Sequence, residues 1–242
     1  MPKIKTVHRI ENRKVVSQKE WIAARKKLLV KEKKFLRLTE VFNEERRALP
    51  WVKVTKNYEF EGPNGTETLA DLFEGRSQLI IYHHMFTADQ EAGCPHCALR
   101  ADCFDGVNIH LKHRDATMIC VSRAPYKKLA AYKKRMGWGF KWVSSGDTDF
   151  NFDFHVSFTE EERRKKTAFF NYAIQDPHHH EREGHSFFYQ NKKGEIFHTY
   201  SCYARGNELF NTHYHYLDVV PKGRDEKGRG PFWVRRHDEY ES

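Results

Sequence analysis

The chain has 242 residues, and its 42 Lys and Arg residues outnumber the 33 Asp and Glu residues to give a formal net charge of +9 at pH 7. This length allows one principal domain with an appendage. Acidic residues are interleaved with the basic ones and no apolar run is long enough to span a bilayer, so neither nucleic acid nor a membrane is an expected partner. Residues 1–5 carry no apolar leader and the cysteine count is odd, which predicts a cytoplasmic protein with reduced thiols.

The first predicted element is a long amphipathic helix. Ser17 and Glu20 form a capping-box pattern, and apolar residues then recur at helical spacing as far as Phe42. The stripe predicts one helix, or two with a break near Thr39, that packs on the main domain or across a dimer; a partner or membrane-surface helix is the alternative. We therefore predict a helical extension over residues 1–55 that contributes to a homodimer, followed by the main domain at 56–242.

The middle of the chain alternates predicted strands and helices. Short strands near residues 52–60 lead to a turn at 62–65 and a short helix at 68–75. Two apolar runs, residues 79–86 and 116–121, predict central strands. The helices predicted after these strands cover residues 98–113 and 125–136. This order calls for neighbouring parallel strands joined by crossovers, in an α/β fold.

The last third is rich in aromatic residues. Their alternation over residues 150–158 predicts a strand, and a second capping box at Thr159 predicts a helix to about Tyr172. A His-rich loop precedes a hairpin that turns at Gly194. A last helix over residues 206–216 and a charged tail complete the predicted elements.

The main chemical signal is the sequence Cys94-Pro95-His96-Cys97 between an apolar strand and a helix, a thioredoxin-type redox signature. A thiol at the helix start meets unpaired backbone N–H groups that lower its pKa, and Pro95 suits the first helical position. His96 adds positive charge beside the thiol. The spacing predicts Cys94 as the reactive thiol and Cys97, one turn later, as the shielded thiol that resolves a mixed disulfide.

Two other interpretations of the pair stay open: half of a zinc site, and thiols kept only by packing. Zinc sites normally add a second Cys pair, whereas Cys103, Cys120 and Cys202 stand singly. The histidines that could complete a metal site are His83, His84, His178, His179, His180, His213 and His215. Adjacent strand histidines point to opposite faces and a loop triplet is normally solvated, so we expect no metal and no cofactor.

A polar and aromatic set near the hairpin could line a ligand pocket. Its members are His198, Tyr200, Tyr203, Arg205, Tyr214 and His215. Arg123 and Arg205 could each hold an acidic ligand through two hydrogen bonds. The alternative is that these side chains bridge core and surface.

Several longer motifs accompany the Cys pair. They are Ser-Arg-Ala-Pro at 122–125, Arg-Met-Gly-Trp at 135–138, Trp-Val-Ser-Ser at 142–145, Phe-Asn-Phe-Asp at 150–153, His-Thr-Tyr-Ser at 198–201, Tyr-Ala-Arg-Gly at 203–206, Tyr-His-Tyr-Leu-Asp at 214–218 and Pro-Lys-Gly-Arg-Asp-Glu at 221–226. Over nearly its whole length the chain resembles the bacterial thioredoxin-like family known as domain of unknown function 899. The resemblance implies a thioredoxin-like three-layer sandwich with a central mixed sheet, and maps Cys94 and Cys97 onto the family's Cys-x-x-Cys.

The function that follows is thiol–disulfide exchange with a protein or small-molecule thiol or disulfide. The alternative is a non-enzymatic thioredoxin-like module that binds a ligand, a partner or zinc. Pro95 and His96 resemble the pair in strongly oxidising bacterial disulfide-forming enzymes, which favours the first. Thioredoxins place a cis-proline before the strand that precedes the terminal hairpin, and the corresponding residues here, 184–186, include none, which favours the second. The Thr/Ser-x-x-Cys turn of peroxiredoxins is also missing around Cys94, so peroxidase chemistry is not expected.

Overall fold

An eight-stranded mixed sheet organises the computed structural model, which describes residues 10, 13–146 and 148–241. Residues 1–5, from which the absence of a leader was predicted, lie outside this described part. The strand order is β1-β10-β9-β4-β5-β6-β2-β3. The strands are β1 (Val52–Lys53), β2 (Glu59–Gly62), β3 (Gly65–Thr68), β4 (Gln78–His83), β5 (Ala116–Ser122), β6 (Trp142–Ser144), β9 (Gly184–Gln190) and β10 (Ile196–Tyr203), with β7 (Ala168–Phe170) and β8 (Ala173–Gln175) forming a separate hairpin.

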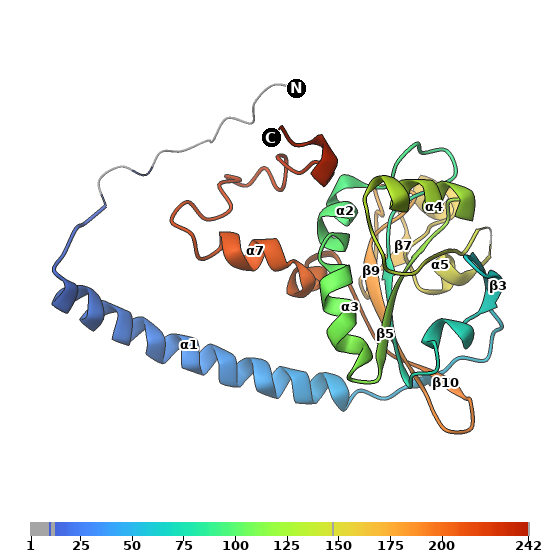
Figure 1. Ribbon diagram of the computed structural model, residues 1–242, viewed down its shortest axis with the longest axis horizontal. Helices are drawn as coiled ribbons and strands as arrows, with labels where there is room; N and C mark the ends of the chain where they lie inside the picture. The colour runs from blue at the N-terminus through green and yellow to red at the C-terminus, as the bar shows by residue number, and fades with distance from the viewer. Residues whose placement is uncertain (1–9, 11–12, 147, 242) are drawn as a thin grey trace.

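Helices lie on both faces of this sheet (Figure 1). The α-helices are α1 (Gln18–Arg47), α2 (Pro95–Ala101), α3 (Phe104–Lys112), α4 (Tyr126–Arg135), α5 (Phe150–Asp153), α6 (Glu160–Lys165) and α7 (Thr212–Leu217), and the 3₁₀ helices are η1 (Asp71–Phe73), η2 (Ala204–Phe210) and η3 (His237–Glu239).

The two predicted central strands are neighbours. β4 runs parallel to β5, with Gln78 opposite Ala116 and His83 opposite Val121, and β9 pairs antiparallel on the other side of β4. Strand side chains alternate between the two faces of a sheet. Tyr82 accordingly joins the core under α2, α3 and α4, whereas Ile81 joins the core with η1 and α5. The predicted three-layer α/β sandwich with a central mixed sheet is confirmed.

Three predicted elements in the last third of the chain are wrong in detail. Residues 150–158 are not a strand: Phe150 and Phe154, four residues apart, lie on one face of α5 and its end, with ring centroids 4.7 Å apart. The helix after Thr159 stops at Lys166, which adopts a left-handed φ of 57°, and β7 follows. The segment predicted as one helix over 206–216 is divided into η2 and α7 at Asn211.

The single helix predicted over 98–113 is also divided. α2 ends at Ala101 and α3 begins at Phe104, with Asp102 and Cys103 between them. Asp102 accepts hydrogen bonds from Trp138 Nε1 at 2.8 Å and from His237 Nδ1 at 2.6 Å. The junction therefore serves as an anchor for other segments of the chain.

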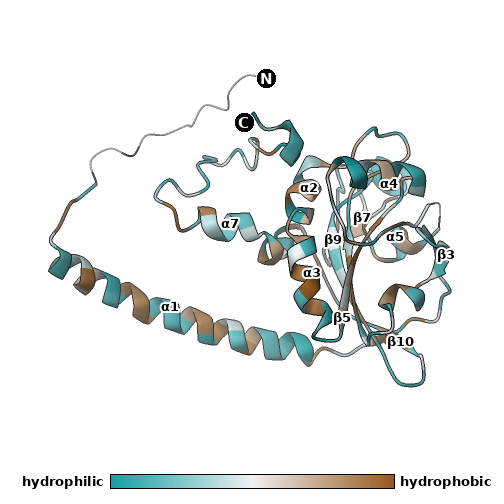
Figure 2. Cartoon of the chain, in the orientation of Figure 1, coloured by the Kyte–Doolittle hydropathy of each residue, from teal (hydrophilic) through white to brown (hydrophobic). Residues whose placement is uncertain are grey.

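Helix α1 is continuous through Thr39, whose hydroxyl donates to the Phe35 carbonyl, and it begins with the predicted capping box at Ser17. None of its residues is buried, and Trp21 and Phe35 are 53% and 68% exposed. Figures 1 and 2 show α1 projecting away from the sheet, with apolar segments along its length. The apolar stripe of α1 is therefore not packed on its own domain, which was one of the predicted alternatives. No described helix is both long and apolar enough to cross a bilayer.

The homodimer stays a prediction, and sedimentation can test it. Association would cover the apolar side chains of α1, so we expect the full chain to sediment as a dimer and a chain beginning at Pro50 as a monomer. The same monomeric mass for both chains would contradict a dimer that depends on α1.

Candidate active site

The loop after β4 holds the Cys pair in one position. The Cys94 N–H donates to the Met85 carbonyl at 3.0 Å, and the Gly93 carbonyl accepts from Arg236 at 2.8 and 3.0 Å. A Cβ atom on residue 93 would lie 2.5 Å from His84 Cε1 and 2.9 Å from Tyr132 Cε1. Only glycine fits this close approach, so the residue before Cys94 is fixed by packing.

The two thiols stand where the sequence placed them. Cys94 is the N-cap residue of α2 and Pro95 is the first helical residue, so Cys97 lies one turn further on. Cys94 is partly exposed, whereas Cys97 is completely buried. All five cysteines are free thiols.

Cys94 has the properties of a stable thiolate. A hydrogen bond from the Cys97 thiol is the largest cause that lowers the pKa of Cys94, to about 5, and His96 and the Cys97 backbone N–H act in the same direction. His96 Nδ1 lies 4.0 Å from Cys94 Sγ, while its Nε2 lies 3.2 Å from the Pro231 carbonyl oxygen. The bond to Cys94 in turn raises the pKa of His96. The two groups therefore stabilise each other's charged forms, a thiolate at Cys94 and an imidazolium at His96.

Cys97 is held as a thiol. Burial is the main cause that raises the pKa of Cys97, and its hydrogen bond to Cys94 adds to the effect. Its Sγ lies 3.5 Å from Glu183 Oε2, and the Met85 N–H points at it from 3.5 Å. The buried thiol thus has a carboxylate at the distance of a sulfur hydrogen bond.

Glu183 and Arg100 are site residues that the sequence did not predict. Glu183 Oε1 lies 3.3 Å from Arg100, which also donates to Tyr82 Oη at 2.6 Å and to Asn211 Oδ1. Glu183 directly precedes β9, where thioredoxins carry a cis-proline, and the described residues contain no cis peptide bond. The sequence could have indicated Glu183 through its position next to a predicted strand, where thioredoxins carry the cis-proline. Arg100 could have been found from its place one turn after Cys97.

A cleft of about 1110 Å³ opens beside Cys94 and His96. Its other walls come from residues 179–183, from η2 and α7, and from the segment 224–235. Arg205 and Tyr214 of the predicted polar and aromatic set line this cleft. His198, Tyr200 and Tyr203 instead line a separate hollow near residues 49–52, and His215 Nε2 bonds to the Leu209 carbonyl. Arg123 donates to the Gly146 carbonyl and lines neither hollow.

The histidines of the described residues are dispersed over the fold. Within the described residues, no three His, Cys, Asp or Glu side chains form a group that could hold a metal ion. Burial lowers the pKa values of His83 and His84 to about 3, so both rings are neutral. Cys120 and Cys202 are buried in strands, and Cys103 is the N-cap of α3.

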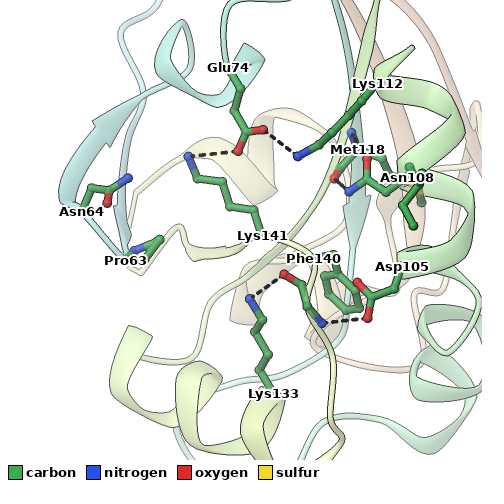
Figure 3. Close-up of a pocket in the computed structure, with 12 residues that line it drawn as sticks. Pro63, Asn64, Glu74, Asp105, Asn108, Lys112, Met118, Lys133, Phe140 and Lys141 are labelled. Atoms are coloured by element: carbon green, nitrogen blue, oxygen red, sulfur yellow. Dashed lines mark hydrogen bonds and ion pairs between the residues drawn. The ribbon is translucent and has the colours of Figure 1, made fainter. Parts of the chain in front are cut away.

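A second, smaller hollow of about 360 Å³ lies next to the amino end of β6 (Figure 3). Its charged side chains have partners within the chain: Glu74 lies 3.2 Å from Lys112 and 3.9 Å from Lys141, and Lys133 donates to the Gly139 carbonyl. It contains no thiol and lies away from the carboxyl end of β4, where the Cys pair is. Its charged groups have structural partners, so the candidate site is the cleft at Cys94.

Residues 10–240 match the family described as "Bacterial protein of unknown function (DUF899)". The chain belongs to this family. Membership confirms the resemblance seen in the sequence, and the observed mixed sheet agrees with the thioredoxin-like fold that it implied. The DUF899 description names no activity, and none of the curated proteins has a similar sequence.

Solved structures with a similar chain path have low sequence identity to this protein. Peroxidoxin BcpB from Mycobacterium tuberculosis is 11% identical, with a TM-score of 0.45 over 67% of this chain and 94% of that chain. PrxQ from Xylella fastidiosa is 14% identical, with a TM-score of 0.42 over 69% and 95%. A putative thiol:disulfide interchange protein DsbE from Chlorobium tepidum is 11% identical, with a TM-score of 0.36 over 63% and 86%.

The low pKa of Cys94 predicts a specific pH profile of alkylation. A thiol with a pKa of about 5 is ionised above that pH, so its reaction with iodoacetamide should be lost only as the pH falls through 5. Mass spectrometry of each cysteine between pH 4 and pH 9 measures this. Cys202, whose pKa burial raises to about 11, serves as the internal reference and should still gain reactivity at pH 9. A midpoint for Cys94 near about 8.5, the value of free cysteine, would contradict the assignment.

Proposed function

We propose that the protein is a thiol–disulfide oxidoreductase that uses Cys94 as nucleophile and Cys97 as resolving thiol. The observation that carries the proposal is the contrast between the surroundings of two thiols within one helical turn. Cys94 is partly exposed with a lowered pKa, and Cys97 is buried with a raised pKa. Two cysteines that served only to pack the core would not need different exposures and opposite pKa shifts.

Exchange would proceed in two displacements. The Cys94 thiolate attacks one sulfur of a substrate disulfide, which forms a mixed disulfide and releases the first substrate thiolate. Cys97 then loses its proton to the Glu183 carboxylate, 3.5 Å away, and attacks Cys94 Sγ. The Cys94–Cys97 disulfide forms and the second substrate thiolate leaves. The substrate disulfide is reduced by two electrons and the protein is oxidised by the same two.

The reverse direction uses the same groups. A substrate thiolate attacks the Cys94–Cys97 disulfide at Cys94, and Cys97 leaves and takes back the proton from Glu183. A second substrate thiolate then displaces Cys94, which leaves as a thiolate stabilised by His96 and the Cys97 thiol. Because stabilisation of the reduced form makes a disulfide more oxidising, the proposal favours a pair that oxidises other thiols.

Cys97→Ser should trap the mixed disulfide, because the first displacement remains and the second is removed. The neutral bis(2-hydroxyethyl) disulfide is a suitable probe, and intact-mass measurement should show one hydroxyethylthio group on Cys94. Cys94→Ser is the matched control and should carry none at equal time. If Cys94 of the Cys97→Ser protein reacts no faster than Cys103, exchange is wrong and the binding-module interpretation takes its place.

Glu183→Gln should slow the second displacement by about tenfold or more while leaving the first within about threefold, since an amide cannot take the Cys97 proton. The amide oxygen still accepts from Arg100, which limits the loss of stability. Rapid mixing with the same disulfide separates the steps, and a melting curve checks the fold. Glu208→Gln, at another carboxylate of the cleft, is the control. Equal slowing of both steps would contradict a role for Glu183 in proton transfer.

A further inference from the structure

The cleft beside Cys94 is richer in cations than in anions. Its arginines are Arg100, Arg182, Arg205, Arg224, Arg229 and Arg235. Its carboxylates are Glu183, Glu208 and Glu226. Since arginine stays protonated at every physiological pH, this lining has a permanent excess of positive charge.

Half of these arginines are neutralised within the chain. Arg100 pairs with Glu183 at 3.3 Å and Arg205 with Glu208 at 3.2 Å. Arg224 pairs with Asp218 at 2.7 Å.

In the described part of the chain, the other three arginines are not neutralised by a carboxylate. Among the described residues, Arg182, Arg229 and Arg235 have no carboxylate within ion-pair distance. Arg182 lies over the Phe170 ring and Arg229 over the Phe232 ring, with 5.5 and 4.0 Å from guanidinium carbon to ring centroid. Arg182 Nε also donates to the Pro177 carbonyl at 2.8 Å, and Arg235 Nη1 donates to the Phe232 and Val234 carbonyls at 3.2 and 2.8 Å. Neutral carbonyls and rings do not cancel the guanidinium charge, and the remaining N–H groups can bind an anion.

We propose that the substrate is a disulfide or thiol of low molecular mass whose arms carry carboxylates, bound by Arg182, Arg229 and Arg235 beside Cys94. This rests on the proposed exchange function and adds the chemical class of its substrate. A carboxylated substrate is repelled by the Cys94 thiolate, and the unpaired guanidinium groups offset that repulsion where the two sulfurs must meet.

The walls of the cleft set the size of the substrate. The C-terminal segment is attached to the thiol loop on one side, through Pro231 with His96 and through Arg236 with Gly93. Residues 179–183 and α7 also line the cleft. Cys94 therefore lies in a cleft of about 1110 Å³, slightly above the usual range for small-molecule sites of about 300–1000 Å³. A disulfide on the surface of a folded protein would have to displace one of these walls.

Three disulfides of similar length and different charge test the proposal on the full chain. They are the dianionic 3,3′-dithiodipropionate, the neutral bis(2-hydroxyethyl) disulfide and the dicationic cystamine. Each rate of reaction with Cys94 is divided by the rate of the same disulfide with 2-mercaptoethanol, which removes intrinsic reactivity. We expect the normalised rates to fall in the order anionic, neutral, cationic, with at least about tenfold between the extremes at low salt. In 1 M salt, where the Debye length is about 3 Å, the order should largely disappear.

Substitutions test which arginines cause the preference for the anionic disulfide. The double variant Arg182→Gln and Arg229→Gln should lower the normalised rate for dithiodipropionate by about fivefold or more and leave the neutral disulfide within twofold. Arg37→Gln with Arg164→Gln, at arginines outside the cleft, removes the same total charge and should change neither rate. The neutral disulfide also reports whether the double variant keeps a working thiol pair.

The outcomes separate the two proposals. If no disulfide reacts with Cys94, exchange itself is wrong. If all three react with equal normalised rates, or if the two double variants lower the dithiodipropionate rate equally, exchange stands and the anionic substrate class is overturned. Faster exchange with insulin, a protein disulfide, than with dithiodipropionate would overturn the proposal that the substrate has a low molecular mass.

Discussion

The site depends on one buried charge. The Arg100 side chain is 6% exposed, so its guanidinium must find its partners inside the protein. It takes them from three separate parts of the chain: Tyr82 on β4, Glu183 before β9, and Asn211 at the start of α7. Loss of one partner of such a buried pair costs about 3–5 kcal/mol, so these segments are held together around α2. The same constraint places the Glu183 carboxylate against the Cys97 thiol.

The division of protonation between the thiols follows from this arrangement. Cys97 is buried beside a carboxylate, which disfavours its thiolate, and its proton is then available to the Cys94 sulfur. Cys94 lies at the helix start with His96 beside it, and the Pro231 carbonyl holds the His96 ring. The C-terminal segment that supplies Pro231 also supplies Arg229 and Arg235 to the cleft. One segment thus orients the group that activates the thiol and provides the charge that would select its substrate.

The sequence predicted what is local in the chain. The capping box at Ser17, the strands of the central pair and the positions of Cys94 and Cys97 depend on near neighbours, and all of these agree with the structure. The strand predicted over residues 150–158 is wrong because Phe150 and Phe154 fit two patterns. Aromatic residues two apart indicate a strand, whereas residues four apart indicate a helix, and packing against the core selects the helix. Glu183 and Arg100 could not be joined from sequence, because a contact across 83 positions requires the topology. The departure from the thioredoxin pattern at the cis-proline position marked the place where Glu183 stands.

The central claim is that Cys94 and Cys97 form a reversible two-electron redox pair, and a redox titration measures this most directly. The protein is equilibrated in glutathione buffers of graded potential, quenched with acid, alkylated, and each cysteine peptide is quantified by mass spectrometry. The account predicts a Cys94–Cys97 disulfide that appears over one transition with two-electron steepness, about 30 mV per tenfold change, while Cys103, Cys120 and Cys202 stay reduced. A pair that stays dithiol at every potential, or that oxidises only together with the other cysteines, would contradict it.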